Sequence, residues 1–161
     1  MDLAIISDTH MPRGHRALPA ACVERLRAAD AILHAGDLVT LDVLALLERL
    51  GPPVYAVHGN VDEPEVRMRL PAVRVVDAAG AQIVMVHDGG PADRRLARLR
   101  ARFAQADAIV FGHSHLPLHE ADGGFQIFNP GSPTDRRRAP RHTMGWAHAA
   151  AGRLEFRLIA L

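Results

Sequence analysis

Short apolar runs that end in polar residues recur along the first two thirds of this 161-residue chain, and this pattern constrains its fold more than any other feature. Successive polar clusters lie 23 to 29 residues apart, a spacing that leaves room for a strand and a helical connection. If the strands lie side by side, their carboxyl ends meet at one edge, where open α/β sheets bind ligands. The clusters begin at Asp8, Asp37, Asn60, His87 and His113.

Hydrophobic periodicity predicts a βαβ-like first part and an antiparallel last third. Helices are expected over residues 18–28, from a Thr40 N-cap to Leu50, and from an Asp93 N-cap to Phe103. The expected strands are Leu3–Ser7, Ala31–Leu33, Val54–Val57, 73–77, 82–86, Ala108–Phe111, Leu118–Ala121, Phe125–Phe128, 143–149 and 153–160.

Length and composition restrict the class of protein. The chain suits one domain over residues 1–161, and its net charge of +1 and 48% hydrophobic content exclude a disordered or strongly basic protein. Cys22, the single cysteine, lies on an apolar helix face and is expected in the core, which fits a reducing compartment. No apolar run reaches the roughly 20 residues of a membrane helix, and the N-terminus lacks a signal-peptide pattern. We therefore expect a soluble, cytoplasmic protein without a membrane partner.

Seven polar side chains at the five strand ends have the chemistry of metal ligands. Each cluster alone is more often a turn or a surface histidine, but five coincidences of this kind favour a common site. Seven nitrogen and oxygen ligands without a thiolate are too many for one tetrahedral zinc and suit two divalent ions. Asp37, in the middle of the set, is the natural bridge between them. The predicted ligands are Asp8, His10, Asp37, Asn60, His87, His113 and His115.

In their order along the chain, these motifs resemble those of the calcineurin-like metallophosphoesterases. The short length and the later Asn129-Pro130-Gly131-Ser132 are similar to the small bacterial and archaeal phosphodiesterase branch, which is related to the metallophosphoesterase-like subunit of retromer. The resemblance implies an α/β fold of two facing mixed sheets flanked by helices, the metallophosphoesterase αββα sandwich. Its motifs are Asp8-x-His10, Gly36-Asp37, Gly59-Asn60, His87 and Gly112-His113-x-His115.

The resemblance also implies how the ligands divide and what they do. One ion would be held by Asp8, His10, Asp37 and His115, and the other by Asp37, Asn60, His87 and His113. A hydroxide bridging the two ions would attack phosphorus in line, so that no side-chain nucleophile is needed. Manganese is the first expectation for the two ions, with iron, zinc, nickel or magnesium as alternatives.

Two departures from the family concern the substrate side of the site. Many relatives carry a leaving-group histidine after the Gly-Asn pair, where this chain has Val61 followed by Asp62. Asp62 is therefore a candidate acid, and Asn60 and Arg13 are candidate contacts for the substrate phosphate. Close relatives often carry glycine after the His87 equivalent, where this chain has Asp88.

The main hypothesis is thus a hydrolase acting on a small phosphate ester, with a phosphodiesterase favoured over a phosphomonoesterase. A metal-binding scaffold for a protein partner is the alternative from another class. A nuclease is a third reading, but the low net charge and the lack of aromatic residues among Arg136, Arg137, Arg138 and Arg141 count against nucleic acid. Self-association into a homo-oligomer is left open.

Overall fold

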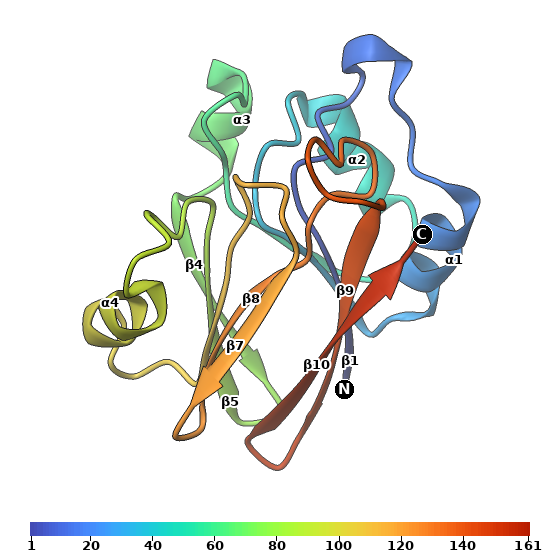
Figure 1. Ribbon diagram of the computed structural model, residues 1–161. Helices are drawn as coiled ribbons and strands as arrows, with labels where there is room; N and C mark the ends of the chain where they lie inside the picture. The colour runs from blue at the N-terminus through green and yellow to red at the C-terminus, as the bar shows by residue number, and fades with distance from the viewer.

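Two five-stranded β-sheets face each other in the computed structural model, which describes residues 1–161, and helices cover their outer faces (Figure 1). The first sheet has the strand order β10-β9-β1-β2-β3, and the second has the order β4-β5-β6-β8-β7. The expected pair of mixed sheets flanked by helices is confirmed. The strands are β1 (Asp2–Ile6), β2 (Ala31–His34), β3 (Val54–Ala56), β4 (Val73–Ala78), β5 (Ala81–Val86), β6 (Ala108–Val110), β7 (Leu118–Asp122), β8 (Phe125–Asn129), β9 (Thr143–Ala150) and β10 (Arg153–Ala160).

Strand directions follow the predicted change along the chain, with one difference. β1, β2 and β3 run parallel, and the hairpins β4–β5, β7–β8 and β9–β10 are antiparallel. β8, although late in the chain, pairs in parallel with β6. The strands that precede the polar clusters are therefore divided between two sheets and do not form five neighbours in one sheet.

Helices α1 (Ala20–Ala28), α2 (Leu41–Glu48) and α3 (Pro64–Arg69) pack on the outer face of the first sheet. Helix α4 (Arg95–Arg102) packs on the outer face of the second (Figure 1). A 3₁₀ turn at Arg13–His15 lies between β1 and α1. None of the helices combines the length and the apolar character that a membrane crossing requires.

The helix ends differ in part from expectation. Thr40 occupies the N-cap position of α2, but its side chain makes no capping hydrogen bond. The predicted Asp93 cap of α4 is wrong, because the residue before the helix is Arg94, whose left-handed backbone (φ 47°) starts the helix later. Helix α3 was not predicted, since Val66 is its single buried residue and so short an apolar pattern has no visible period.

The layer between the sheets holds the two halves of the molecule in register. Burying a side chain of leucine or phenylalanine size contributes about 1.5–3 kcal/mol, so this layer fixes how the loops above one sheet face those above the other. Its large and fully buried members are Leu3, Ile5 and Leu33 from the first sheet and Ile83, Met85 and Phe128 from the second.

Cys22 lies in the core between α1 and the first sheet, as the sequence predicts. Burial raises the pKa of its thiol to about 12, so the reactive thiolate is scarce at neutral pH. We expect the folded protein to resist alkylation by iodoacetamide at pH 8, and the same protein in guanidinium chloride to react fully. Mass spectrometry measures both, and rapid labelling of the folded chain would contradict the burial of this thiol.

Candidate metal centre

The five polar clusters converge above the carboxyl ends of strands from both sheets. β1, β2 and β3 deliver their clusters from the first sheet, and β5 and β6 deliver theirs from the second. Hydrogen bonds join the two sides: Nδ1 of His87 lies 2.8 Å from the carbonyl oxygen of Ala35, and the backbone N–H of His113 donates to the carboxylate of Asp8. The structure therefore brings the seven predicted ligands to one place.

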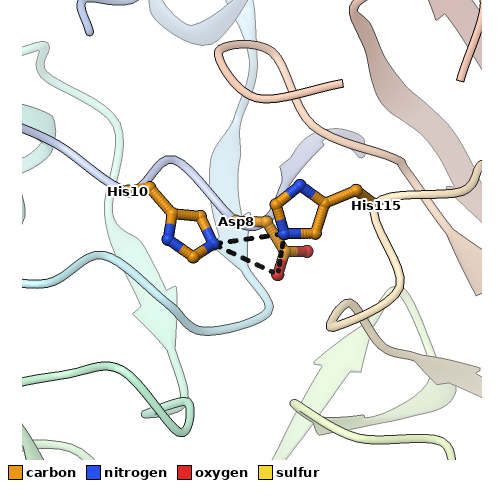
Figure 2. Close-up of side chains that lie close together, drawn as sticks. All are labelled: Asp8, His10 and His115. Atoms are coloured by element: carbon orange, nitrogen blue, oxygen red, sulfur yellow. Dashed lines mark hydrogen bonds and ion pairs between the residues drawn. The ribbon is translucent and has the colours of Figure 1, made fainter. Parts of the chain in front are cut away.

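Asp8, His10 and His115 form the first group of candidate ligands (Figure 2). Oδ1 of Asp8 lies 3.4 Å from Nε2 of His115 and 4.0 Å from Nε2 of His10, and the two Nε2 atoms are 3.2 Å apart. All three side chains are buried. Three donor atoms thus point at a single small space.

The ring of His115 is held in one orientation by the loop that follows β8. Its Nδ1 donates to the backbone carbonyl of Asp135, and Arg16 forms an ion pair of 3.2 Å with the carboxylate of Asp135. Burial lowers the pKa of His115 to about 4, so the ring is neutral at pH 7. Its Nε2 therefore carries a lone pair toward Asp8, which is the form that binds a metal ion.

Asp37, Asn60, His87 and His113 form the second group. Nε2 of His87 lies 3.0 Å from Oδ1 of Asn60 and 3.3 Å from Oδ2 of Asp37. Nδ1 of His113 lies 2.9 Å from the same oxygen of Asn60. Asn60 and His113 are exposed, whereas the first group is closed off from solvent. The second group therefore forms the open side of the centre.

Asp37 lies between the two groups. Its Oδ2 is 3.5 Å from Nε2 of His10 and 3.3 Å from Nε2 of His87. Its other oxygen accepts a hydrogen bond of 3.0 Å from the backbone N–H of Val61, which holds the carboxylate in place. This position fits the bridging role predicted for Asp37. Asp8 also approaches both groups.

The donor set as a whole fits divalent cations. With Nδ1 of His87 and of His115 turned to backbone carbonyls, lone pairs on both rings face carboxylate and amide oxygens. Burying so many hydrogen-bond acceptors together costs free energy unless a cation or a proton lies among them. A metal ion accepts a lone pair from every one of these atoms. The seven side chains therefore form a candidate metal centre.

Burial and close charges shift the pKa values of three candidate ligands, Asp8, Asp37 and His87. Burial raises the pKa of Asp8 to about 7. Burial acts in the same direction on Asp37, but the hydrogen bond and charge of His87 outweigh it and lower the pKa of Asp37 to about 2. Burial acts to lower the pKa of His87, but its hydrogen bond to Asp37 and the charge of Asp8 raise it. The negative charge of Asp37 therefore favours a positive charge beside it, which a bound cation would supply.

The backbone at five of the ligands is strained. A left-handed conformation costs a non-glycine residue roughly 1–3 kcal/mol, and such residues cluster at functional sites. The surrounding loops therefore hold these side chains in place against a local preference for other conformations. The five residues, with their φ angles, are Asp8 (55°), His10 (47°), Asp37 (59°), His113 (69°) and His115 (59°).

The three glycines before the ligands serve two different purposes. Gly36 has a φ of 94°, a conformation that glycine adopts without strain. Gly59 and Gly112 have no positive φ, and they are needed for a different reason. A Cβ at position 59 would lie 2.0 Å from Oδ1 of Asp37, and one at position 112 would lie 1.9 Å from Oγ of Ser7 and 2.6 Å from Oδ2 of Asp8. These two glycines leave room for the ligands themselves.

We expect Gly112→Ala to weaken metal binding at least tenfold, because the added methyl group must displace Ser7 and the carboxylate of Asp8. Overpacking of this kind also destabilises a protein by about 1–3 kcal/mol. Calorimetric titration with Mn²⁺ and thermal unfolding measure the two effects. Gly124→Ala is the control, because its φ of 88° strains alanine while a Cβ there meets nothing within 4 Å. Equal loss of metal affinity in both variants would contradict the role of close approach.

Several residues outside the predicted ligand set support the ligands. Asn129 donates to the carbonyl of Gly112 (2.8 Å), and Ser132 donates to the carbonyl of Asp8 (2.8 Å). These bonds explain why the Asn-Pro-Gly-Ser segment accompanies the ligand motifs. His34 is a satisfied core histidine: its Nδ1 accepts from the N–H of Gly36, and its Nε2 bonds the hydroxyl of Thr9. Burial lowers the pKa of His34 to about 3, which keeps this support neutral.

Asp62, the candidate acid, is buried and faces the backbone. Its two oxygens accept hydrogen bonds from the N–H groups of Asp37 (3.2 Å), Val39 (2.6 Å) and Gly59 (2.6 Å). These three donors belong to the loops that carry Asp37 and Asn60. The geometry therefore favours a role in positioning the ligands over a role in proton transfer.

The other candidates lie outside the ligand cluster. Arg13 is exposed in the 3₁₀ turn, and its side chain makes no hydrogen bond or ion pair with the seven predicted ligands. Arg136 donates to the carbonyl of Ala139 within its own loop. Asp88 is exposed and accepts from the N–H of Gly90 (2.7 Å), which closes the turn after His87.

Comparison with known proteins identifies relatives over most of the chain. A model of the calcineurin-like phosphoesterase superfamily domain matches residues 1–152. A chain of Methanothermobacter thermautotrophicus described as a probable metallophosphoesterase is 33% identical over 136 residues, which are 83% of this chain and 78% of that one.

Solved structures share the fold at lower sequence identity. A Vps29 variant from Entamoeba histolytica has a TM-score of 0.80 at 22% identity and covers 100% of this chain and 99% of its own. Wild-type Vps29 of the same organism, solved in complex with zinc, has a TM-score of 0.79 at 21% identity, with 99% of each chain covered. An archaeal phosphodiesterase has a TM-score of 0.78 at 20% identity, with 100% of each chain covered.

Proposed function

The chain belongs to the calcineurin-like phosphoesterase superfamily, and from this membership we propose that it hydrolyses phosphodiesters with the help of two divalent metal ions, manganese first among them. The observation that carries the proposal is the position of Asp37, one oxygen of which lies 3.5 Å from His10 and 3.3 Å from His87. A carboxylate in this position can join two ion sites. The archaeal phosphodiesterase with the same fold supports the choice of a diester.

Two divalent ions in such a site acidify a water molecule and neutralise charge on the phosphoryl oxygens. The chain's own residues hold the site in the required form. His87 and His115 are oriented through their Nδ1 atoms, so that both Nε2 atoms face inward. Asn60, on the open side, would contact the substrate phosphate as well as an ion.

The positions that follow Asn60, where many relatives carry a leaving-group histidine, offer no free acid. Val61 has no titratable group, and the carboxylate of Asp62 is occupied by three backbone N–H groups. We therefore expect a preference for esters whose leaving group departs without a proton.

Hydrolysis of bis-p-nitrophenyl phosphate by chelator-stripped protein, with and without added Mn²⁺, tests the proposal. Activity that appears only with the metal is the expected result. Absence of activity in protein that holds its full complement of metal would refute it, and would favour a metal-binding scaffold for a protein partner. Because the chain shares its fold with Vps29, this scaffold is the second candidate function.

The proposal includes three finer points. The substrate is a small phosphate ester, because the net charge of +1 and the lack of aromatic residues among Arg136, Arg137, Arg138 and Arg141 count against nucleic acid. The protein acts in the cytoplasm, in keeping with its unpaired Cys22. The third point is self-association into a homo-oligomer, which sedimentation of the metal-loaded protein tests.

A further inference from the structure

A surface pocket of 290 Å³ begins at two of the candidate ligands, Asn60 and His87, and extends away from the metal centre. Val73 and Val86 contribute apolar wall, and the side chains of Arg67 and Arg102 also line it. We call this hollow the arginine pocket. A group attached to a phosphate that is bound at Asn60 and His87 reaches it directly.

Arg67 is held rigidly at the wall of the arginine pocket. Its Nε donates to the carbonyl of Asp62 (2.9 Å), and its Nη2 donates to the carbonyl of Asn60. Its Nη1 makes no hydrogen bond, and no carboxylate lies within ion-pair distance of the guanidinium group. A fixed cation with free donor capacity therefore borders the pocket.

Arg102 reaches the same pocket from the end of α4. Its Cζ lies 4.9 Å from the ring centroid of Phe103, a contact that restrains the guanidinium group. It too has no carboxylate partner. The single acidic residue of the pocket, Asp88, is occupied by the N–H of Gly90 and pairs with neither arginine. Two unpaired cations against one carboxylate leave the pocket positively charged.

We propose that the arginine pocket binds an anionic group on one ester arm of the substrate, so that the preferred substrate is a phosphodiester with a second negative charge. This inference rests on the proposed function, because it places the phosphate at the metal centre. Arg67 and Arg102 pair with the anionic group, and the apolar wall contacts the carbon atoms between that group and the phosphate. Specificity then comes from the pocket, and the chemistry from the metal centre.

The test compares two phosphonates that differ only at the end of a three-carbon arm: 3-phosphonopropanoate, which carries a carboxylate, and propylphosphonate, which is neutral there. Their dissociation constants are measured by calorimetry on the Mn²⁺-loaded protein. We expect the carboxylate compound to bind about five to ten times more tightly, the gain typical of a charged hydrogen-bonded pair at a partly exposed site. Since phosphonates are not hydrolysed, this readout is independent of turnover.

The variant Arg102→Gln is expected to lower the ratio of the two dissociation constants, because Arg67 alone is then left to pair with the carboxylate. The matched control is Arg100→Gln on the same helix, whose side chain pairs with Asp122 (3.2 Å) outside the pocket and whose loss should leave the ratio unchanged. Arg67 is unsuitable as a test, because its side chain also supports the backbone of Asn60.

Equal binding of both phosphonates by the wild type, or an unchanged ratio in Arg102→Gln, would overturn the arginine pocket. Failure of both compounds to bind the Mn²⁺-loaded protein would overturn it as well. A ratio that behaves as expected in a protein without diesterase activity would uphold the pocket and refute the proposed function. The two proposals can therefore fail separately.

Discussion

Replacement of Asp37 by asparagine is expected to abolish turnover and to leave at most one strongly bound metal ion per chain. The amide keeps an oxygen for the N–H of Val61, which lies 3.0 Å from Oδ1, but it removes the negative charge between His10 and His87. Loss of a bridging carboxylate costs several kcal/mol of transition-state stabilisation, which corresponds to a rate reduction on the order of a thousandfold or more. Calorimetric titration with Mn²⁺ and diester hydrolysis measure the two effects.

Asp42→Asn is the matched control, because Asp42 is an exposed carboxylate in the first turn of α2, away from the ligands. Circular dichroism verifies that both variants are folded, and Asp37→Ala extends the series by removing the side chain altogether. If Asp37→Asn binds two ions with unchanged affinity, Asp37 does not bridge the two ion sites. Wild-type turnover in the same variant would remove the case for metal-dependent catalysis at this centre.

Replacement of Asp62 by asparagine is expected to destabilise the protein by about 3 kcal/mol. A carboxylate accepts all three N–H donors, whereas the amide offers one acceptor oxygen and turns an N–H₂ group toward the others. A buried donor left without a partner costs about 1–3 kcal/mol. For a chain of this size the melting temperature should fall by roughly 6–12 °C. Metal affinity should fall as well, since two of the donors belong to Asp37 and Gly59.

This variant also separates the two roles considered for Asp62. If it positions the ligands, stability and metal affinity fall and the pH dependence of kcat keeps its shape. If it also acts as the acid, the basic limb of the pH profile is lost in addition. Asp30→Asn is the control, because Asp30 accepts one exposed N–H, that of Asp2 (2.6 Å), and surface changes of this kind stay within about 0.5 kcal/mol.

The convergence of the seven candidate ligands was predictable because strand ends are visible in a sequence. Where a run of apolar residues is followed by Asp, Asn or His, that polar side chain lies at the carboxyl end of a strand. This holds whichever strand is the neighbour in the sheet. All seven predicted ligands accordingly meet in the structure. The assignment of Asp62 shows where this reasoning stops. In the sequence it lies close to Asn60, which makes it a candidate acid. In the structure it accepts hydrogen bonds from three backbone N–H groups, which belong to residues up to 25 positions away along the chain.

The sequence by itself determined the strands, their polar ends and the chemistry of the ligands, because alternating or continuous apolar runs and the residues that end them are local properties of the chain. Only the tertiary structure decided that these strands belong to two sheets, that Gly59 and Gly112 make room for ligands, and that Arg67 and Arg102 border one pocket. The physical reason is packing: the layer between the sheets sets which loops face each other, and close approach, shared hydrogen bonds and unpaired charge exist only between the segments that packing brings together.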